Sequence, residues 1–241
     1  MEERLQKILA KAYHISRRHA ETWIQEGTIS VNGEIAQLGC SADAERDVIQ
    51  VGSKRLNTHA LQTQTEVWMM YKPKGIMCTH DDPFSQQTLQ AILPQHFNKR
   101  KWMFVGRLDK ESEGLLLLTN DGNFVNRVSH PSANITKTYR VQIDLPFDTA
   151  LIPQLQKGLL CDGEKLFFKE IYPVNSRKLD IVLSQGKKRE IRRLLAAFHY
   201  NVLRLKRWKI GQLTLDKKLM PGQCRRLSCR EINLIFGTKS E

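Results

Sequence analysis

Apolar and polar positions in the first quarter of the chain predict two short helices followed by a hairpin. Apolar side chains recur at helical spacing in residues 5–12 and 17–26, and Ser16 stands at the capping position of the second helix. Asn32-Gly33 then separates two short β-prone runs, which is a strong signal for a two-residue hairpin turn. A last short strand, DVIQVG, follows. This pattern predicts a small module over residues 1–58.

The pattern changes beyond this module. Residues 59–66 are polar and lack periodicity, which is typical of a linker. From residue 67 onward, strands such as KTYRVQID and KLDIVLSQ outnumber helices such as REIRRLLAAFHY and do not alternate regularly with them. The segment SCREINLIFG opens with a Ser228/Glu231 capping box and closes at a glycine. We therefore expect an α+β fold in which residues 67–241 form a mixed, largely antiparallel sheet flanked by helices.

The stretch FVGRLDKESEGLLLLTNDG places a charged connection between two apolar runs. MFV and LLLLT are predicted strands, so GRLDKESEG must join them, and Gly106 lets the backbone turn. Asp109 is then held between two rigid elements, which is a good way to aim a side chain. Aspartate is also common in ordinary turns, so spacing alone leaves a structural role open. Glu111 and Glu113 are interpreted as turn residues, which leaves little support for a hydrolase with paired carboxylates.

Composition narrows the class of protein. The hydrophobic fraction of 41% and the mean hydropathy of -0.43 suit a soluble globular protein, and no apolar run approaches the length needed to cross a bilayer. The charged N-terminus is unlike a secretory signal, and the five cysteines form no C-x-x-C pair, which indicates reduced thiols in the cytoplasm. The sequence contains no P-loop, dinucleotide or metal-cluster motif, which is consistent with a protein that needs neither a cofactor nor a metal.

The net charge of +13 predicts a polyanionic partner. Residues 1–60 hold 8 basic and 8 acidic side chains, so the whole excess lies in the remainder of the chain. It peaks between Lys187 and Lys209, where nine basic residues accompany a single acid, Glu190. A solvated helix face can be basic, but such faces usually mix both signs. Nucleic acid is therefore the favoured partner.

Gly106-Arg107-Leu108-Asp109, followed by EGLLLLTNDG, resembles the signature of the pseudouridine synthases, specifically the ribosomal RNA group that includes RsuA and RluB. Other segments resemble that family in the same order: YKPKGIMCTHDDP, KTYRV, QGKKREIRRL and IGQLTLDKKLMPGQCRRLS. The first module resembles the RNA-binding domain named after small-subunit ribosomal protein S-four. The resemblance covers almost the whole chain, and the joint order of the motifs is more specific than any one of them.

The resemblance implies that the protein isomerises a specific uridine in ribosomal RNA to pseudouridine, and the REIRRL form of one motif slightly favours the large subunit. It implies that Asp109 is the catalytic carboxylate and that Arg107 takes the place of the flipped base in the RNA stack. It also implies that the ring of Tyr139 lies against uracil and that the cation Arg192 stabilises the charged carboxylate. Without the resemblance, Tyr139 would be interpreted as a core residue and the arginines as RNA-facing cations.

Further RNA contacts are expected from basic residues in both parts of the chain: Lys187, Lys188 and Arg189 in the catalytic part, and Arg17 and Arg18 in the first module. That module is neutral overall, although a docking module would be expected to carry excess positive charge. The implied partner is ribosomal RNA or a pre-ribosomal particle, and the implied state is a monomer without membrane contact. The alternative is a non-catalytic RNA-binding factor in ribosome assembly, which would have no use for the carboxylate.

Overall fold

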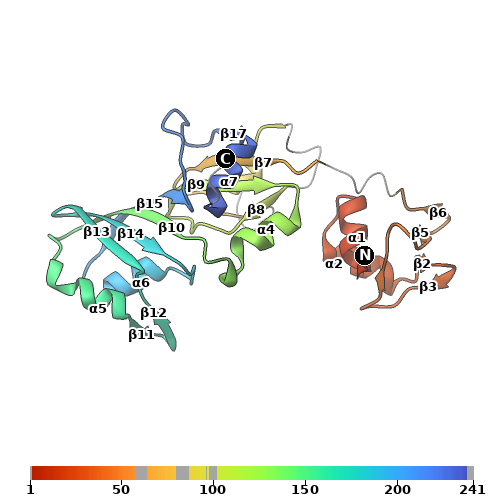
Figure 1. Ribbon diagram of the computed structural model, residues 1–241, viewed down its shortest axis with the longest axis horizontal. Coiled ribbons are helices and arrows are strands. Elements are labelled where there is room, and N and C mark those ends of the chain that lie inside the picture. Colours follow the sequence, from red (N-terminus) through yellow and green to blue (C-terminus); the bar gives the residue numbers. More distant parts are fainter. Residues whose placement is uncertain (1, 58–63, 80–86, 96, 98–101, 238–241) are drawn as a thin grey trace. The chain divides into compact units, whose positions relative to one another are not determined.

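The computed structural model describes residues 2–57, 64–79, 87–95, 97 and 102–237 (Figure 1). These residues form two compact units, one that reaches Thr65 and one that begins at Glu66. Most of the linker predicted at residues 59–66 lies outside the described residues.

The first unit combines two helices with a four-stranded sheet and a two-stranded sheet. Its elements are β1 (Glu3–Arg4), α1 (Leu5–Ala12), α2 (Arg17–Gln25), β2 (Ile29–Val31), β3 (Glu34–Ile35), β4 (Ser41–Ala42), β5 (Ile49–Val51) and β6 (Lys54–Arg55). The Ser16 side chain caps α2 by accepting a hydrogen bond from the His19 amide at 2.9 Å. Asn32 and Gly33 both have positive φ in the turn between β2 and β3, as a primed hairpin turn requires. The predicted order of two helices and a hairpin is confirmed.

The second unit is built on a nine-stranded sheet (Figure 1). Its elements are β7 (Val67–Lys72), α3 (Leu89–Ile92), β8 (Met103–Val105), β9 (Glu113–Thr119), α4 (Gly122–Ser129), η3 (Pro131–Ala133), β10 (Lys137–Ile143), η4 (Thr149–Leu151), α5 (Ile152–Lys157), β11 (Leu159–Cys161), β12 (Glu164–Leu166), β13 (Glu170–Asn175), β14 (Lys178–Leu183), α6 (Glu190–Ala196), β15 (Val202–Ile210), β16 (Leu213–Thr214), β17 (Cys224–Arg226) and α7 (Cys229–Phe236). The strand order is β13-β14-β10-β15-β9-β7-β17, with β16 beside β15 and β8 beside β9.

Every strand pair in this sheet is antiparallel except β9 with β15, which is parallel. The hairpin β11–β12 stands apart from the sheet as a two-stranded ribbon. Helices α5 and α6 lie beside β13, β14 and β10, whereas α4 and α7 lie beside β9 and β7 (Figure 1). The expected α+β fold with a mixed, largely antiparallel sheet is therefore confirmed.

Strand β9 is buried on both of its faces. Leu115 and Leu117 pack in an apolar cluster with α4 and α7, while Leu116 and Leu118 pack in a second cluster with α3. Side chains alternate between the two faces of a strand, so helices cover β9 on both sides. The loop that precedes β9 therefore ends at one of the most enclosed elements in the unit.

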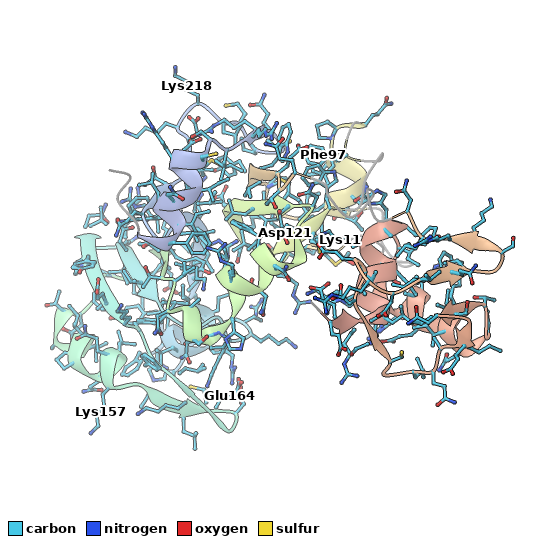
Figure 2. The ribbon with its side chains drawn as sticks, turned by 45° about the vertical axis from the view of Figure 1, so that its right-hand side comes forward. Lys11, Phe97, Asp121, Lys157, Glu164 and Lys218 are labelled. Carbon is cyan, nitrogen blue, oxygen red and sulfur yellow. The ribbon has the colours of Figure 1, made fainter. Side chains whose placement is uncertain are left out.

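Side-chain caps fix the helices that pack on β9. Asp121, labelled in Figure 2, accepts a hydrogen bond from the Asn123 amide at 2.8 Å and begins α4. The predicted capping box of Ser228 and Glu231 begins α7, and Gly237 ends it with a φ of +74°. The local sequence signals at these helix ends are thus confirmed.

One glycine permits the parallel contact between β9 and β15. Lys206 lies opposite Glu113, and Arg207 lies opposite Gly114. Gly114 has a φ of +110°, and a Cβ atom there would lie 2.2 Å from the Arg207 carbonyl oxygen. The two strands can approach this closely only because position 114 carries no side chain.

We expect Gly114→Ala to lower the free energy of unfolding by about 3 kcal/mol or more, because positive φ strains alanine and the new methyl group overlaps backbone. Gly163→Ala is the matched control, since Gly163 also has a positive φ of +77° but nothing lies within 4 Å of its Cβ position. Its expected loss is about 1 kcal/mol. Urea denaturation followed by tryptophan fluorescence measures both values, and equal losses would contradict the argument.

Candidate functional site

The loop between β8 and β9 spans residues 106–112 and carries Asp109. Asp109 is half-buried, Arg107 is exposed and Leu108 is buried. The Asp109 carbonyl accepts the Ser112 amide at 3.0 Å, which closes a tight turn before β9. Leu108 lies in the same apolar cluster as Tyr139 of β10 and the buried residues of α6. The structure thus brings the Asp109 loop, Tyr139 and α6 into one region of the sheet.

Lys72, the last residue of β7, is fully buried beneath this loop. Its ammonium group donates to the carbonyl of Ser112 at 2.7 Å, of Pro73 at 2.9 Å and of Lys110 at 3.3 Å. An ammonium has three donors, so these carbonyls use all of them. Burial lowers the pKa of Lys72, and nearby acidic groups, Asp109 among them, oppose that shift. Lys72 therefore fixes the end of the loop and places a positive charge near the candidate carboxylate.

Arg207 of β15 holds the beginning of the same loop. Its side chain is 4% exposed, and its Nε donates to the Leu115 carbonyl at 2.7 Å while Nη1 lies 3.5 Å from the Arg107 carbonyl. Arg207 is also paired with Tyr139 across β10 and β15. Within the described residues it forms no ion pair, and its buried Nη2 has no hydrogen-bond partner. Arg207 belongs to the basic run between Lys187 and Lys209, but its side chain lies inside the protein.

Arg192 of α6 reaches the loop from a third direction. Its Nη2 donates to the Glu111 carbonyl at 3.1 Å and its Nη1 to the Val202 carbonyl at 2.9 Å. Burial and the charge of Arg189 lower the pKa of Arg192, and Asp109 and Glu111 oppose this shift. Across the part of the chain that the structure describes, no ion pair of 4.0 Å or less joins Arg192 to Asp109. The expected direct pair is not formed here; the guanidinium holds backbone carbonyls while attracting Asp109 over a longer distance.

Tyr139 is 9% exposed and lies at an irregularity in the pairing of β10 with β15, between Thr138 and Tyr139. Its ring belongs to the apolar cluster that contains Leu108, the residue directly before Asp109. The position therefore combines the core packing expected of an alternating strand with proximity to the candidate loop.

Glu113 is not the turn residue that its sequence context indicates. It is the first residue of β9, is 8% exposed, and accepts hydrogen bonds from the Tyr71 hydroxyl at 3.0 Å and from Arg204 Nε. Burial by itself raises the pKa of Glu113, but the bonds from Arg204 and Tyr71 lower it overall. Lys206 lies over the Tyr71 ring, 4.5 Å from its centroid. These contacts give Glu113 a structural role at the contact between β9 and β15.

In the basic turn before α6, one side chain is hydrogen-bonded within the protein and two are exposed to solvent. Lys187 donates from Nζ to the Lys165 carbonyl at 2.9 Å, so this side chain ties the turn to β12. Lys188 and Arg189 are exposed, and Arg189 caps α6 with a φ of +51°. Beneath them Glu190 is 2% exposed; burial raises the pKa of its carboxyl group, which accepts the Lys187 amide at 3.2 Å. Lys188 and Arg189 are thus better placed than Lys187 to contact RNA.

Arg193 is also occupied within the protein. It forms ion pairs with Asp162 at 3.0 Å and with Glu164 at 2.6 Å, and Glu164 is labelled in Figure 2. Nη2 donates to the Cys161 carbonyl at 2.6 Å. These bonds attach the hairpin β11–β12 to α6 and raise the pKa of Arg193.

The first unit presents two of its predicted RNA-binding residues to solvent. Arg17 and Arg18 are exposed on the first turn of α2, and Lys11 is exposed near the end of α1. Lys7 forms an ion pair with Glu3 at 2.6 Å, so part of the local positive charge is already compensated. Arg17, Arg18 and Lys11 are therefore exposed cations of this unit, as are Lys54 and Arg55 of β6.

The five cysteines are free thiols. Cys78 accepts the Leu108 amide at 3.3 Å, and burial raises the pKa of its thiol. In the described ranges, no three His, Cys, Asp or Glu side chains are grouped so that they could hold a metal ion. The same ranges contain no helix that is both long and apolar enough to cross a membrane.

Comparison with known proteins agrees with this architecture. The sequence matches the RNA pseudouridylate synthase family over residues 66–197 and the S4 domain over residues 3–39. A crystal structure of a pseudouridylate synthase superimposes with a TM-score of 0.70 at 29% identity, covering 96% of this chain and 98% of the other. The fold is thus that of a pseudouridine synthase preceded by an S4 domain.

Individual relatives extend the match along the whole chain. A Vibrio vulnificus protein named ribosomal large subunit pseudouridine synthase B is 35% identical over 98% of this chain and 75% of its own length. A protein of the same name from Escherichia coli O6:H1 is 35% identical over 98% of this chain and 82% of its own length. This chain belongs to the RNA pseudouridylate synthase family. The resemblance inferred from the sequence motifs is confirmed, and the protein is an isomerase rather than a non-catalytic binding factor.

Sequence reasoning missed Lys72 and Arg207 as supports of the loop. Lys72 closes the strand VWMMYK, in which apolar residues occupy both faces, so a lysine there has no solvent side. That pattern was a usable signal for a buried cation. The signal for Arg207 is weaker, because its burial depends on the distant strand β9.

We expect Lys72→Met to lower kcat by roughly tenfold to a hundredfold, since losing the ammonium leaves buried carbonyls unpaired and releases the end of the loop. Lys74→Met is the matched control: Lys74 is exposed and pairs with Glu111 at 3.6 Å, so its loss should change kcat less than twofold, as is usual for a surface ion pair. Single-turnover assays on rRNA, together with circular dichroism, separate loss of catalysis from loss of folding. Equal rates for the two variants would refute a positioning role for Lys72.

Proposed function

We propose that this protein converts one uridine of large-subunit ribosomal RNA to pseudouridine, with Asp109 as the catalytic carboxylate. The observation that carries the proposal is the placement of Asp109 in a loop whose carbonyls are held by Lys72, Arg192 and Arg207. The names of the full-length relatives supply the large-subunit substrate. Among the described residues of the matched catalytic domain, Asp109 is the only aspartate in a loop that leads directly into a fully buried strand.

The reaction needs a carboxylate and a flipped base, but it changes no oxidation state. The N1–C1′ glycosidic bond breaks, uracil turns over, and C5 bonds to C1′; C5 gives up its proton and N1 takes one up, so the product is an isomer. Asp109 acts on the ribose, and both routes that fit this chemistry, attack at C1′ and proton abstraction that starts elimination, require its ionised form. Lys72 and Arg192 both interact electrostatically with Asp109.

The remaining site residues take roles that match their exposure. Arg107 is exposed beside Asp109, where it can fill the gap that a flipped base leaves in the RNA stack. The ring of Tyr139 lies against the uracil and assists removal of the C5 proton. Arg192 and Arg207 position the loop, and they do so through backbone carbonyls.

RNA binding is shared between two domains in this proposal. Residues 1–58 form the docking domain, residues 59–66 the linker and residues 67–241 the catalytic domain. Arg17 and Arg18 contact RNA from the first domain, and Lys188 and Arg189, with a smaller contribution from Lys187, contact it from the second. The protein acts as a monomer in the cytoplasm, on ribosomal RNA or a pre-ribosomal particle.

We expect Asp109→Asn, which is nearly isosteric, to fold and bind RNA normally but to form no pseudouridine. Pseudouridine mapping across all rRNA in a deletion strain and its parent identifies the site that disappears. Complementation with the wild-type gene should restore that site, and complementation with Asp109→Asn should not. Restoration by the variant would overturn the catalytic assignment, whereas a lost site in small-subunit rRNA would overturn the proposed substrate alone.

Removal of residues 1–60 is expected to leave a folded catalytic domain, because the loop and all three cations that hold it lie beyond Glu66. The truncated protein should reach the same single-turnover rate at saturating concentration, but its half-saturation should need more protein. Single-turnover titrations of both proteins on the same rRNA measure the two quantities. Equal half-saturation would refute the docking role, and an inactive but folded truncation would make the first domain part of the catalytic machinery.

A further inference from the structure

A groove of about 510 Å³ lies between α4, η3 and α7, within the second unit and apart from the Asp109 loop. Its walls come from seven residues that differ in chemistry, namely Asn126, Arg127, His130, Ser132, Ala133, Ile135 and Phe236. Ile135 and Phe236 belong to the apolar cluster of α4 and α7, whereas Leu108 and Tyr139 belong to the cluster of α6. The groove is therefore not an extension of the candidate active site.

The hydrogen bonds of His130 fix the direction in which it can donate. Its Nδ1 accepts the Ser132 amide at 3.3 Å and lies 2.7 Å from the Ser132 hydroxyl, so we assign the ring proton to Nε2. Pro131 occupies the first turn of η3, and Asn134 ends it in the left-handed region. The rigid turn leaves Nε2–H as the free donor of this imidazole.

Arg127 is held in place by the ring of Phe236. The guanidinium carbon lies 4.4 Å from the ring centroid, and Phe124 packs edge-on against the same ring at 5.9 Å. A stacked guanidinium keeps its N–H edges free for a hydrogen-bond acceptor, and it loses little freedom on binding one. No carboxylate lines the groove, and Arg127 forms no ion pair within the described part of the chain.

This donor set favours a phosphate over a base. Arg127, His130 and Asn126 supply donors around one space, which suits the unesterified oxygens of a phosphodiester. The face of Phe236 toward Arg127 is already covered by the guanidinium, so it offers no stacking platform to a base. Ile135 also lies only four residues before Tyr139, so their Cα atoms are at most about 14 Å apart. Because α4 and α7 cover the face of the sheet opposite to Tyr139, a phosphate in the groove would belong to a part of the RNA away from the target nucleotide.

We propose that the groove formed by Arg127, His130 and Asn126 binds a backbone phosphate of the substrate RNA outside the target nucleotide, without reading its sequence. This inference rests on the proposed rRNA substrate. It adds a contact that is separate from the basic turn before α6, and it gives a role to a segment that the catalytic assignment leaves unused. A phosphate contact should contribute to affinity and to its salt dependence, but not to the chemical step.

The test compares Arg127→Gln with the matched control Arg177→Gln in the full-length protein. Arg177 is also exposed, but it lies in the turn between β13 and β14, far along the sheet order from α4. The probes are a transcript that contains the mapped uridine and an unrelated RNA of equal length. At low salt, Arg127→Gln should weaken binding of both RNAs by about tenfold. It should also reduce the slope of log K against log salt by about 0.7 to 0.9, the value for one phosphate.

The turnover rate, thermal unfolding and a charge-conserving variant test the proposed contact further. The single-turnover rate at saturating protein should equal that of the wild type. Thermal unfolding should shift only slightly, because Arg127 is exposed and the variant loses a single contact with the Phe236 ring. Arg127→Lys keeps the charge and should keep the salt slope. Unchanged affinity and slope in Arg127→Gln, or an equal loss in Arg177→Gln, would overturn the proposed contact. A loss confined to the target transcript would overturn its sequence-independent nature. None of these results depends on whether the wild-type protein forms pseudouridine, so the proposed function is tested independently.

Discussion

Hydrogen bonds from cationic side chains to the backbone carbonyls of the loop at residues 106–112 are the constraint on which the site depends. Burying an ammonium or a guanidinium away from water is costly unless its donors are used. Here backbone carbonyls use all three donors of Lys72 and some of the donors of Arg192 and Arg207, in place of a paired carboxylate. Lys72 and Arg192 both lie within electrostatic reach of Asp109. The same bonds that fix the loop therefore leave positive charge available to one carboxylate, and such preorganised charge requires no rearrangement during the reaction.

The cations can meet the loop because of how the sheet is joined. Strand β9 contacts β15 through only two residue pairs, and Gly114 allows the close approach. That contact brings Arg207 to the Leu115 carbonyl and links the strands that carry Tyr139 with the strands that carry Lys72. Glu113, held by Tyr71 and Arg204, reinforces the same place. The geometry of the candidate site and the pairing of β9 with β15 consequently depend on the same small region.

Local signals in the sequence were sufficient for the elements and for the position of the loop. The Ser16 cap, the Asn32-Gly33 turn and the Ser228/Glu231 box each depend on residues within a few positions of one another, so the sequence predicts them directly. The loop that carries Asp109 was predicted from the strands that flank it, and the proposed role of Asp109 came from the family motif. Tertiary pairing, by contrast, decides which charged residues are buried. Periodicity cannot report that Arg207 and Glu113 lie inside, since their burial comes from a strand about ninety residues away. The family motif led to Arg192, but it did not reveal that its guanidinium holds carbonyls rather than Asp109.

The sequence separations of these contacts have a consequence for the order in which the site is assembled during synthesis. Glu111 and Arg192 are 81 residues apart, and Arg107 and Arg207 are 100 residues apart. When the loop leaves the ribosome, Lys72 has already been made, but the two arginines have not. Water must then bind the carbonyls that Arg107 and Glu111 later present to those arginines. Long-range contacts form late because closing large loops is entropically unfavourable. The loop that carries Asp109 therefore reaches its final form only after almost the entire second unit has been translated, which makes maturation of the candidate site a late event in the life of the nascent chain.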